Sequence, residues 1–275
     1  MTHAPYGGQG GRRLFMKRIK HIRIIGAGLS GMVAGISLAR EGFRVTIYDA
    51  QKKIGGSPLL HPSVHTTPAQ LPELCAYTGI DFTGAFVPCD PYPVFYNKTR
   101  RLTFPPYVKY NRAYCIERGP RPSSIDTILY NIAVKERVRF EFGRKADFPA
   151  LGPGTIVATG LDAAGYGAFG IPRRFVYGAW SAREIDDRRA TGNIYMGPFS
   201  TDYGYTAQVN GLDYNLLFSR RPLKDGDLAA YRATLKKIGI ADYPDPWCRV
   251  TMAVPAAVRL FAGDVILAGT LSGMI

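Results

Sequence analysis

Hydrophobic positions follow two different periods near the start of this chain. Ile22 to Ile25 form a short β-branched run that ends at a glycine, which is typical of a buried parallel strand. Leu29 to Glu41 carry small and apolar residues at helical spacing, and Gly42 follows as a stop signal. Phe43 to Tyr48 form a second apolar run. Together these segments predict a strand–helix–strand unit of the usual size.

Further along, strand-rich and helical stretches alternate. Amphipathic spacing predicts helices over Pro68 to Thr78, Ser123 to Glu136 and Asp227 to Ile238. The stretch "VFYNKTRRLTF" predicts a hairpin, and Arg174 to Arg221 predict an antiparallel meander rich in tyrosine and glycine. Short apolar runs predict further buried strands at three places: Val138 to Phe142, Thr155 to Ala158 and Val265 to Ala268.

This order predicts an α/β fold in which a β-rich domain is inserted into a Rossmann-like domain. We expect the Rossmann-like domain to be discontinuous and to comprise residues 21–79, 119–165 and 260–275. Residues 80–118 and 166–259 would form the antiparallel β-rich domain, which would bind the substrate. Residues 1–20 are basic and glycine-rich, and they predict a disordered tail.

The stretch "GAGLSG" contains the spacing G-x-G-x-x-G between a predicted strand and a predicted helix. Gly26 would permit the tight turn, Gly28 would let a pyrophosphate approach the backbone, and Gly31 would let the helix pack closely on the sheet. The helix N-terminus would add free N–H groups and the positive end of its dipole. Asp49 closes the second strand, where a carboxylate can accept hydrogen bonds from ribose hydroxyls. The motif therefore predicts a dinucleotide site.

A glycine doublet, Gly55 and Gly56, follows Asp49 by six and seven residues. From here the sequence resembles the FAD-dependent oxidoreductases related to para-hydroxybenzoate hydroxylase and geranylgeranyl reductase. "TIVATG" and "GDVILAGTLSG" resemble two further motifs of that family. The resemblance implies FAD as the cofactor, bound by the matching positions Gly26, Ala27, Gly28, Leu29, Ser30, Gly31, Asp49, Ala50, Gly55, Gly56, Ser57, Ala158, Thr159, Gly160, Gly269 and Thr270.

Two departures from the family pattern affect the end of the chain. The preferred alignment puts Gly269-Thr270 where the family has Gly-Asp, so a hydroxyl replaces the carboxylate that binds the ribityl chain. A competing alignment uses Gly263-Asp264 instead. In the family a helix follows this turn, whereas the sequence ends at Ile275. The missing helix predicts either a truncated or split flavoprotein or an unusually exposed flavin ring.

Composition and charge narrow the class of partner. The net charge is +14, which suits anionic partners, but no Lys/Arg stripe with interleaved aromatics predicts nucleic-acid binding. The four cysteines have no CxxC spacing, so we expect reduced thiols in a cytoplasmic protein, without a metal site. The apolar C-terminal stretch is interrupted by Pro255, Arg259 and Asp264, so we expect buried strands and at most peripheral membrane contact.

No catalytic triad is visible, and we assign no catalytic residue. His61 and His65 follow the glycine doublet and could lie near a flavin ring, although loop histidines are the simpler interpretation. Tyr203 and Tyr205 could line a substrate pocket, although sheet aromatics often only pack a core. A second dinucleotide motif is missing, so the reductant would be external, such as NAD(P)H or a redox protein.

The sequence thus predicts an FAD-dependent oxidoreductase or monooxygenase that acts on an apolar or aromatic small molecule. The geranylgeranyl reductase branch would imply an isoprenoid substrate. The alternative is a flavin-binding accessory subunit, or half of a split enzyme that a partner chain completes, without turnover of its own. An NAD-dependent enzyme is a third interpretation, which the glycine doublet and the Ala-Thr-Gly strand oppose.

Overall fold

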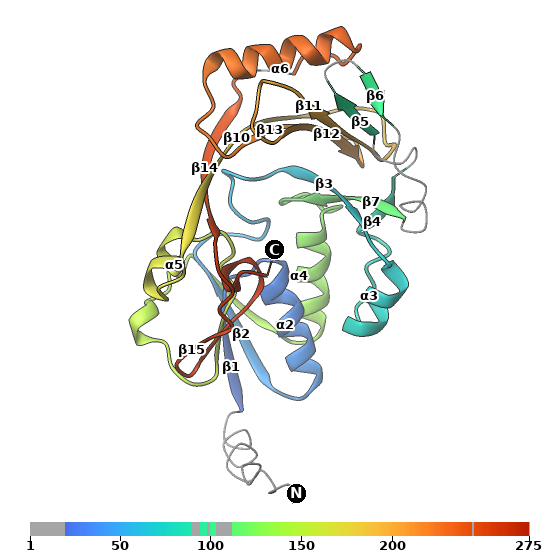
Figure 1. Cartoon of the computed structure of the whole chain (residues 1–275). Coiled ribbons are helices and arrows are strands. Elements are labelled where there is room, and N and C mark those ends of the chain that lie inside the picture. Colours follow the sequence, from blue (N-terminus) through green and yellow to red (C-terminus); the bar gives the residue numbers. More distant parts are fainter. Residues whose placement is uncertain (1–19, 90–93, 98–99, 103–111, 244, 275) are drawn as a thin grey trace, which may run out of the picture.

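A computed structural model describes residues 20–89, 94–97, 100–102, 112–243 and 245–274 of the chain. The predicted tail, residues 1–20, lies outside the described residues except for Lys20. The described strands form sheets of six, seven and three strands, which lie at different levels of the molecule (Figure 1). A Rossmann-like domain with additional antiparallel sheets confirms the predicted α/β class.

The six-stranded sheet belongs to the Rossmann-like domain. Its strands are parallel except at one edge, where β15 runs antiparallel to β16. In spatial order they are β15 (Phe261–Ala262), β16 (Val265–Leu267), β9 (Thr155–Val157), β1 (His21–Ile25), β2 (Arg44–Asp49) and β8 (Arg139–Phe142). Its helices are α2 (Leu29–Arg40), α4 (Ile125–Lys135) and α5 (Ala163–Ala168), with short 3-10 turns η2 (Phe148–Ala150) and η3 (Gly269–Ser272).

The helix α4 begins where the sequence predicted a serine cap. The hydroxyl of Ser124 accepts a hydrogen bond from the backbone N–H of Thr127 and satisfies a donor of the first turn. The apolar faces of α2 and α4 pack on the sheet and form one core with β1 and β2. Its fully buried members include Ile24, Met32 and Leu129. This core holds β1 and α2 rigidly, and with them the glycine loop that joins the two elements.

The seven-stranded sheet is antiparallel except where β11 pairs with β5. In spatial order it contains β14 (Cys248–Pro255), β10 (Arg173–Glu184), β13 (Leu212–Ser219), β12 (Tyr203–Val209), β11 (Thr191–Met196), β5 (Val94–Asn97) and β6 (Arg100–Leu102). The predicted meander and hairpin are both present. Helix α6 (Asp225–Lys237) covers the outer face of this sheet (Figure 1).

A three-stranded antiparallel sheet lies between these two layers (Figure 1). It consists of β3 (Ser63–Pro68), β7 (Ala113–Arg118) and β4 (Phe86–Pro88). Pro68 was predicted to begin a helix, but it ends β3, and α3 (Leu71–Thr78) begins after it. Alternate side chains of β7 face opposite layers: Ile116 joins the core of α2 and α4, and Cys115 joins the core beneath β12.

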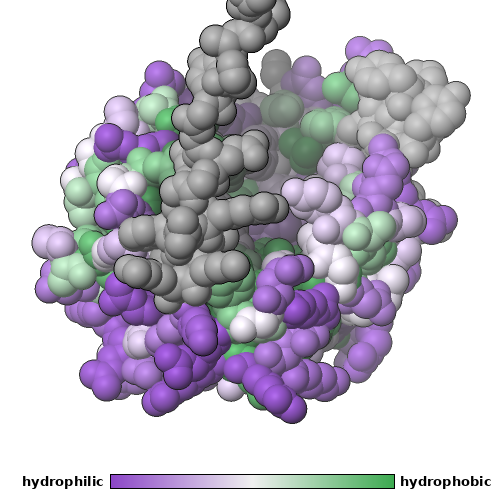
Figure 2. Space-filling view, turned by 90° about the horizontal axis from the view of Figure 1, so that it is seen from below, coloured by the Kyte–Doolittle hydropathy of each residue, from purple (hydrophilic) through white to green (hydrophobic). Residues whose placement is uncertain are grey.

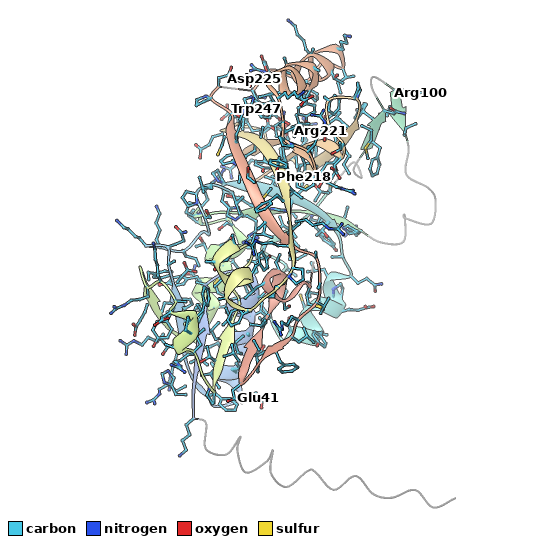
Figure 3. All side chains as sticks on the ribbon, turned by 60° about the vertical axis from the view of Figure 1, so that its left-hand side comes forward. Glu41, Arg100, Phe218, Arg221, Asp225 and Trp247 are labelled. Atoms are coloured by element: carbon cyan, nitrogen blue, oxygen red, sulfur yellow. The ribbon has the colours of Figure 1, made fainter. Side chains whose placement is uncertain are left out.

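The two ends of the molecule differ in character. Seen from below, the free end of the Rossmann-like domain is covered mostly by hydrophilic side chains (Figure 2). The residues Phe218, Arg221, Asp225 and Trp247 gather near α6, whereas Glu41 lies at the opposite end (Figure 3). The glycine loop lies at the inner end of β1, facing the middle layer (Figure 1).

Candidate functional site

The glycine loop joins the end of β1 to the start of α2. A Cβ on Gly26 would clash with the carbonyl of Ala158, and a Cβ on Gly31 would clash with the carbonyl of Gly26. Gly28 differs, because nothing lies within 4 Å of the place a Cβ would take, although its φ of −77° is open to any residue. Packing therefore requires glycine at positions 26 and 31, whereas Gly28 borders open space.

Open space at Gly28 is where a phosphate group would approach the helix. Gly28 caps α2 without a side-chain hydrogen bond, and the first turn contains no acidic residue. The N–H groups of this turn are therefore available to an anion, and the helix dipole favours one. After the end of the neighbouring strand β9, the Oγ1 of Thr159 is buried without a hydrogen-bond partner. An unpaired buried hydroxyl is costly, so this atom is also available to a bound group.

Asp49 lies at the end of β2 and braces the loop. Its two carboxylate oxygens accept hydrogen bonds from the backbone N–H of Ala27 at 2.6 Å and of Gln51 at 2.7 Å. The sequence assigned Asp49 to ribose hydroxyls and missed this structural role. Because each carboxylate oxygen can accept more than one hydrogen bond, the bracing contacts leave acceptor capacity for a ribose. Ala50, also in the predicted set, follows directly after the strand.

The glycine doublet occupies a turn that only glycine adopts easily. Gly55 and Gly56 have φ values of 118° and 71°. A Cβ on Gly55 would lie 2.7 Å from the backbone N of Pro120, and one on Gly56 would lie 2.7 Å from Cδ2 of His61. Ser57 then begins the next loop, which Trp180 of β10 holds through a hydrogen bond from its Nε1 to the carbonyl of Leu59.

The C-terminal motif meets the first motif in space. Gly269 has a φ of 63°, and a Cβ there would clash with the hydroxyl group of Ser30 in α2. The hydroxyl of Tyr166 in α5 donates a hydrogen bond of 3.5 Å to the carbonyl oxygen of Thr270. Gly263 and Asp264 lie in the turn between β15 and β16, before the strand instead of after it. The pair 269–270 is therefore the one that reaches the glycine loop.

These positions fit the diphosphate of a dinucleotide. The structure gathers the three motifs around the inner ends of β1, β2, β9 and β16, because the carboxyl ends of parallel strands share one edge of a sheet. The predicted positions on this edge are Gly26, Ala27, Gly28, Leu29, Ser30, Gly31, Asp49, Ala50, Ala158, Thr159, Gly160, Gly269 and Thr270.

The two histidines after the doublet belong to one hydrogen-bonded set. Nδ1 of His61 lies 2.9 Å from Oγ of Ser63, which lies 3.2 Å from Nε2 of His65. Burial, and then the guanidinium of Arg118, lowers the pKa of His61 to about 3 and that of His65 to about 4, although Asp126 opposes the shift. Both rings are therefore neutral near pH 7.

A partly buried ion pair lies beside the histidine set, because Ser63 pairs with Arg118 across β3 and β7. Arg118 donates two hydrogen bonds to Asp126, at 2.8 and 3.0 Å, and the backbone N–H of Gly119 donates a third. Burial raises the pKa of Asp126, but these donors outweigh burial and hold it below its ordinary value. Sequence reasoning missed Ser63, Arg118 and Asp126. The alternation of polar residues at 61, 63 and 65 was the available signal for a strand face.

The two candidate substrate tyrosines occupy the same face of β12 but different surroundings. Tyr205 is 9% exposed, and its hydroxyl is hydrogen-bonded to Oγ1 of Thr66 at 2.7 Å. Burial raises its pKa well above the ordinary value. Tyr205 thus packs between the seven-stranded and three-stranded sheets. Tyr203 is only half-buried and stacks on Phe218, with ring centroids 5.6 Å apart.

The described residues contain neither a metal-binding cluster nor a membrane-spanning helix. Among the residues with described positions, no group of three or more His, Cys, Asp or Glu side chains could hold a metal ion. No helix in the described part of the chain is long and apolar enough to cross a membrane.

The segment that contains the glycine loop matches a known family of domains. Residues 24–59 match the family model of the NAD(P)-binding Rossmann-like domain. The chain is 31% identical over 137 residues to flavin-containing monooxygenase FMO GS-OX-like 3 of Arabidopsis thaliana, which covers 45% of this chain and 28% of the relative. It is 48% identical over 40 residues to a kynurenine 3-monooxygenase of Legionella pneumophila, covering 14% of this chain and 9% of the relative.

Solved structures match nearly the whole chain in fold. A flavin-dependent halogenase from Xanthomonas campestris gives a TM-score of 0.66 at 12% identity, with 92% of this chain and 66% of the halogenase covered. CtdE in complex with FAD gives 0.63 at 10% identity, with 93% of this chain and 78% of CtdE covered. A peptidyl tryptophan dihydroxylase gives 0.61 at 15% identity, with 91% and 60% covered. The chain therefore spans under a third of the first sequence relative and 60% of the dihydroxylase.

Proposed function

We propose that this chain binds FAD and serves in an FAD-dependent oxidoreductase of the monooxygenase type. The observation that carries the proposal is the open space at Gly28 beside an uncapped helix start, with the other motifs gathered around it. The names of the sequence relatives and the FAD in the CtdE structure support the choice of flavin over nicotinamide. As part of this proposal, the chain is related to the para-hydroxybenzoate hydroxylase and geranylgeranyl reductase flavoproteins.

Each part of the site has a role in that proposal. The first turn of α2 would hold the diphosphate, Asp49 the adenosine ribose, and Thr159 and Thr270 polar groups of the ribityl stretch. Bound FAD would supply hydride acceptance and, once reduced, oxygen activation. The chain itself would position the flavin between the six-stranded and three-stranded sheets and restrict the access of water to it.

The substrate would be an apolar or aromatic small molecule, with an isoprenoid as the narrower option. Tyr203 supports this choice, because its half-buried ring can stack on a flat apolar ligand. The electrons would come from NAD(P)H or from a redox protein. The absence of CxxC spacing among the four cysteines fits a reducing compartment such as the cytoplasm, and the net charge of +14 fits at most peripheral contact with an anionic membrane.

An absorption spectrum of the purified protein, before and after heat release of any ligand, tests the proposal. We expect flavin bands and free FAD in the supernatant, followed by bleaching of the bands when NADPH or a reduced redox protein is added. A protein that is colourless and takes up neither added FAD nor added NAD contradicts nucleotide binding. Uptake of NAD alone would favour the nicotinamide interpretation.

A flavin-binding accessory subunit without its own turnover is the alternative function. Thr270 favours it, because this hydroxyl stands where the related flavoproteins have a carboxylate. A partner chain that completes the substrate site would belong to the same alternative. Substrate turnover by the isolated, FAD-loaded chain would exclude it. Reduction that occurs only after a partner protein is added would support it.

A further inference from the structure

A chain of three hydrogen-bonded side chains lies at the start of the strand β3. Oγ of Ser63 lies 2.9 Å from Nδ1 of His61 and 3.2 Å from Nε2 of His65. Ser63 and His65 share one face of β3, as alternate side chains in a strand do, and His61 precedes the strand. Ser63 is only 2% exposed, so its hydroxyl is shielded from water and is committed to the two imidazole rings.

The two ends of this chain have different surroundings. Nε2 of His61 would lie 3.0 Å from a Cβ placed on Gly56, so this nitrogen points at the glycine doublet. The side chain of His65 is exposed, although enough protein surrounds it for desolvation to lower its pKa. The set therefore connects a water-accessible face of β3 with the turn at Gly56.

Both rings are in the protonation state that proton transfer along such a chain requires. A neutral imidazole has one donor nitrogen and one acceptor nitrogen, whereas an imidazolium can only donate. Burial, and then the positive charge of Arg118, lowers the pKa of both rings and keeps them neutral, and Asp126 binds that guanidinium through two hydrogen bonds. Arg118 and Asp126 are the charged groups that face the set, from β7 and α4.

We propose that His65, Ser63 and His61 form a proton relay between the accessible face of β3 and the cofactor side of Gly56. A proton that arrives at Nδ1 of His65 releases the proton of its Nε2 to Oγ of Ser63. The hydroxyl proton of Ser63 passes to Nδ1 of His61, whose Nε2 would release its proton to a basic atom of the flavin or substrate bound beside Gly56. One proton enters and one leaves, so neither ring keeps a charge. The relay rests on the proposed function, which needs protons at the flavin.

The substitution Ser63→Ala breaks the relay with the smallest change in volume. A matched control is Ser219→Ala, because Ser219 is also fully buried and its hydroxyl also makes two hydrogen bonds, to Thr201 and from the N–H of Arg221. Ser219 ends β13, in the seven-stranded sheet, whereas Ser63 lies in the three-stranded sheet. Circular dichroism and the thermal midpoint of unfolding establish that both variants fold.

The first measurement needs no cofactor. Nuclear magnetic resonance of ¹⁵N-labelled histidine reports which ring nitrogen carries the proton. We expect matched tautomers in the wild type, with both protons on Nε2 or both on Nδ1, because one hydroxyl cannot donate to both rings. In Ser63→Ala we expect this match to be lost, and in Ser219→Ala to be kept. Identical tautomers in the wild type and Ser63→Ala would overturn the relay.

The second measurement follows proton uptake in the FAD-loaded protein. Light and EDTA reduce the flavin, and a pH indicator records the protons taken up. We expect uptake at least about tenfold slower in Ser63→Ala than in Ser219→Ala, and we expect added imidazole to restore the rate in His65→Ala. Equal rates in the two serine variants would overturn the relay and leave the proposed function intact. Failure of the wild type to take up FAD would contradict the proposed function. The tautomer measurement would then still show whether the hydroxyl of Ser63 links the rings of His61 and His65.

Discussion

Glycines are required by packing in both the Rossmann-like domain and the seven-stranded sheet, but for different reasons. In the glycine loop the close neighbour is backbone: the carbonyl of Gly26 faces Gly31, five residues away. In β12 the close neighbour of Gly204 is the ring of Tyr231, which comes from α6. The first requirement is encoded by local spacing, and the second depends on a contact that forms only in the folded sheet. For this reason only the glycine requirement of the loop appears in the sequence as a motif.

The largest effect is expected for Gly31→Ala. The new Cβ would clash with the backbone carbonyl of Gly26, which cannot move without displacing the loop. We expect a loss of about 3 kcal/mol or more in the free energy of unfolding, together with loss of FAD binding. Urea unfolding and an FAD titration measure the two effects. Wild-type FAD affinity in a destabilised Gly31→Ala protein would contradict the loop geometry.

The contrasting substitution is Gly204→Ala. Its Cβ would clash with the Tyr231 ring, whose hydroxyl is hydrogen-bonded to Asn215 at 2.7 Å. Because a side chain can shift more easily than a backbone carbonyl, we expect a smaller loss of about 2 kcal/mol. FAD affinity should stay at the wild-type value, since β12 lies in the other sheet. A parallel loss of FAD affinity would show that the two regions are coupled more tightly than the packing suggests.

Acid should destabilise the middle of the molecule through its histidines. The pKa of His61 is about 3 and that of His65 about 4 in the folded state, against about 6.5 in an unfolded chain. Between these values the unfolded state binds more protons, so stability falls as the pH drops from 6.5 toward 4. His21, whose pKa is also lowered, adds to the trend.

The thermal midpoint between pH 7 and pH 5 measures this effect. We expect a fall of about 2–4 °C for each kcal/mol lost, and a smaller fall in the double variant His61→Gln, His65→Gln. An equal fall in the wild type and the double variant would assign the acid sensitivity to other groups.

The smallest effect is expected at the contact between the two antiparallel sheets. Tyr205→Phe removes the hydrogen bond to Thr66 and keeps the buried ring. Thr66 retains Cys115 as a partner at 3.6 Å, so we expect a loss of only about 1 kcal/mol in the free energy of unfolding. Urea unfolding measures it. A loss of several kcal/mol would mean that this hydroxyl pair is a main connection between the sheets.

The parts of the fold that follow local patterns could be predicted from the sequence. The strand at Ile22, the helix after Gly28 and the cap at Ser124 depend on neighbouring residues, and each was placed within about two residues of its observed position. The meander of β11, β12 and β13 was also predicted, because turn residues separate its strands. The predicted α/β class is confirmed.

The middle layer could not be predicted, because its strands pair across long stretches of sequence. β3 pairs with β7, so Ser63 lies opposite Arg118. Pro68 suggested a helix start by its type, yet it ends β3 because the pairing with Ala113 decides its conformation. The roles of Ser63 and of the Arg118–Asp126 pair follow from that pairing. The contact between Gly269 and Ser30 likewise joins segments that are far apart in the sequence, so no local pattern predicts it. The predicted contacts with a cofactor remain predictions.

In the proposed function, the space beside Gly28 holds the diphosphate of FAD. Gly28→Ala tests it most directly, because a Cβ fits there in the free protein and would fill the space that a phosphate needs. Gly226→Ala in the first turn of α6 is the matched control, since it also meets nothing within 4 Å. The measurement is an FAD titration of both variants and the wild type. We expect unchanged folding in both variants, and FAD affinity lowered at least about tenfold only in Gly28→Ala. Equal affinity in all three proteins would contradict it.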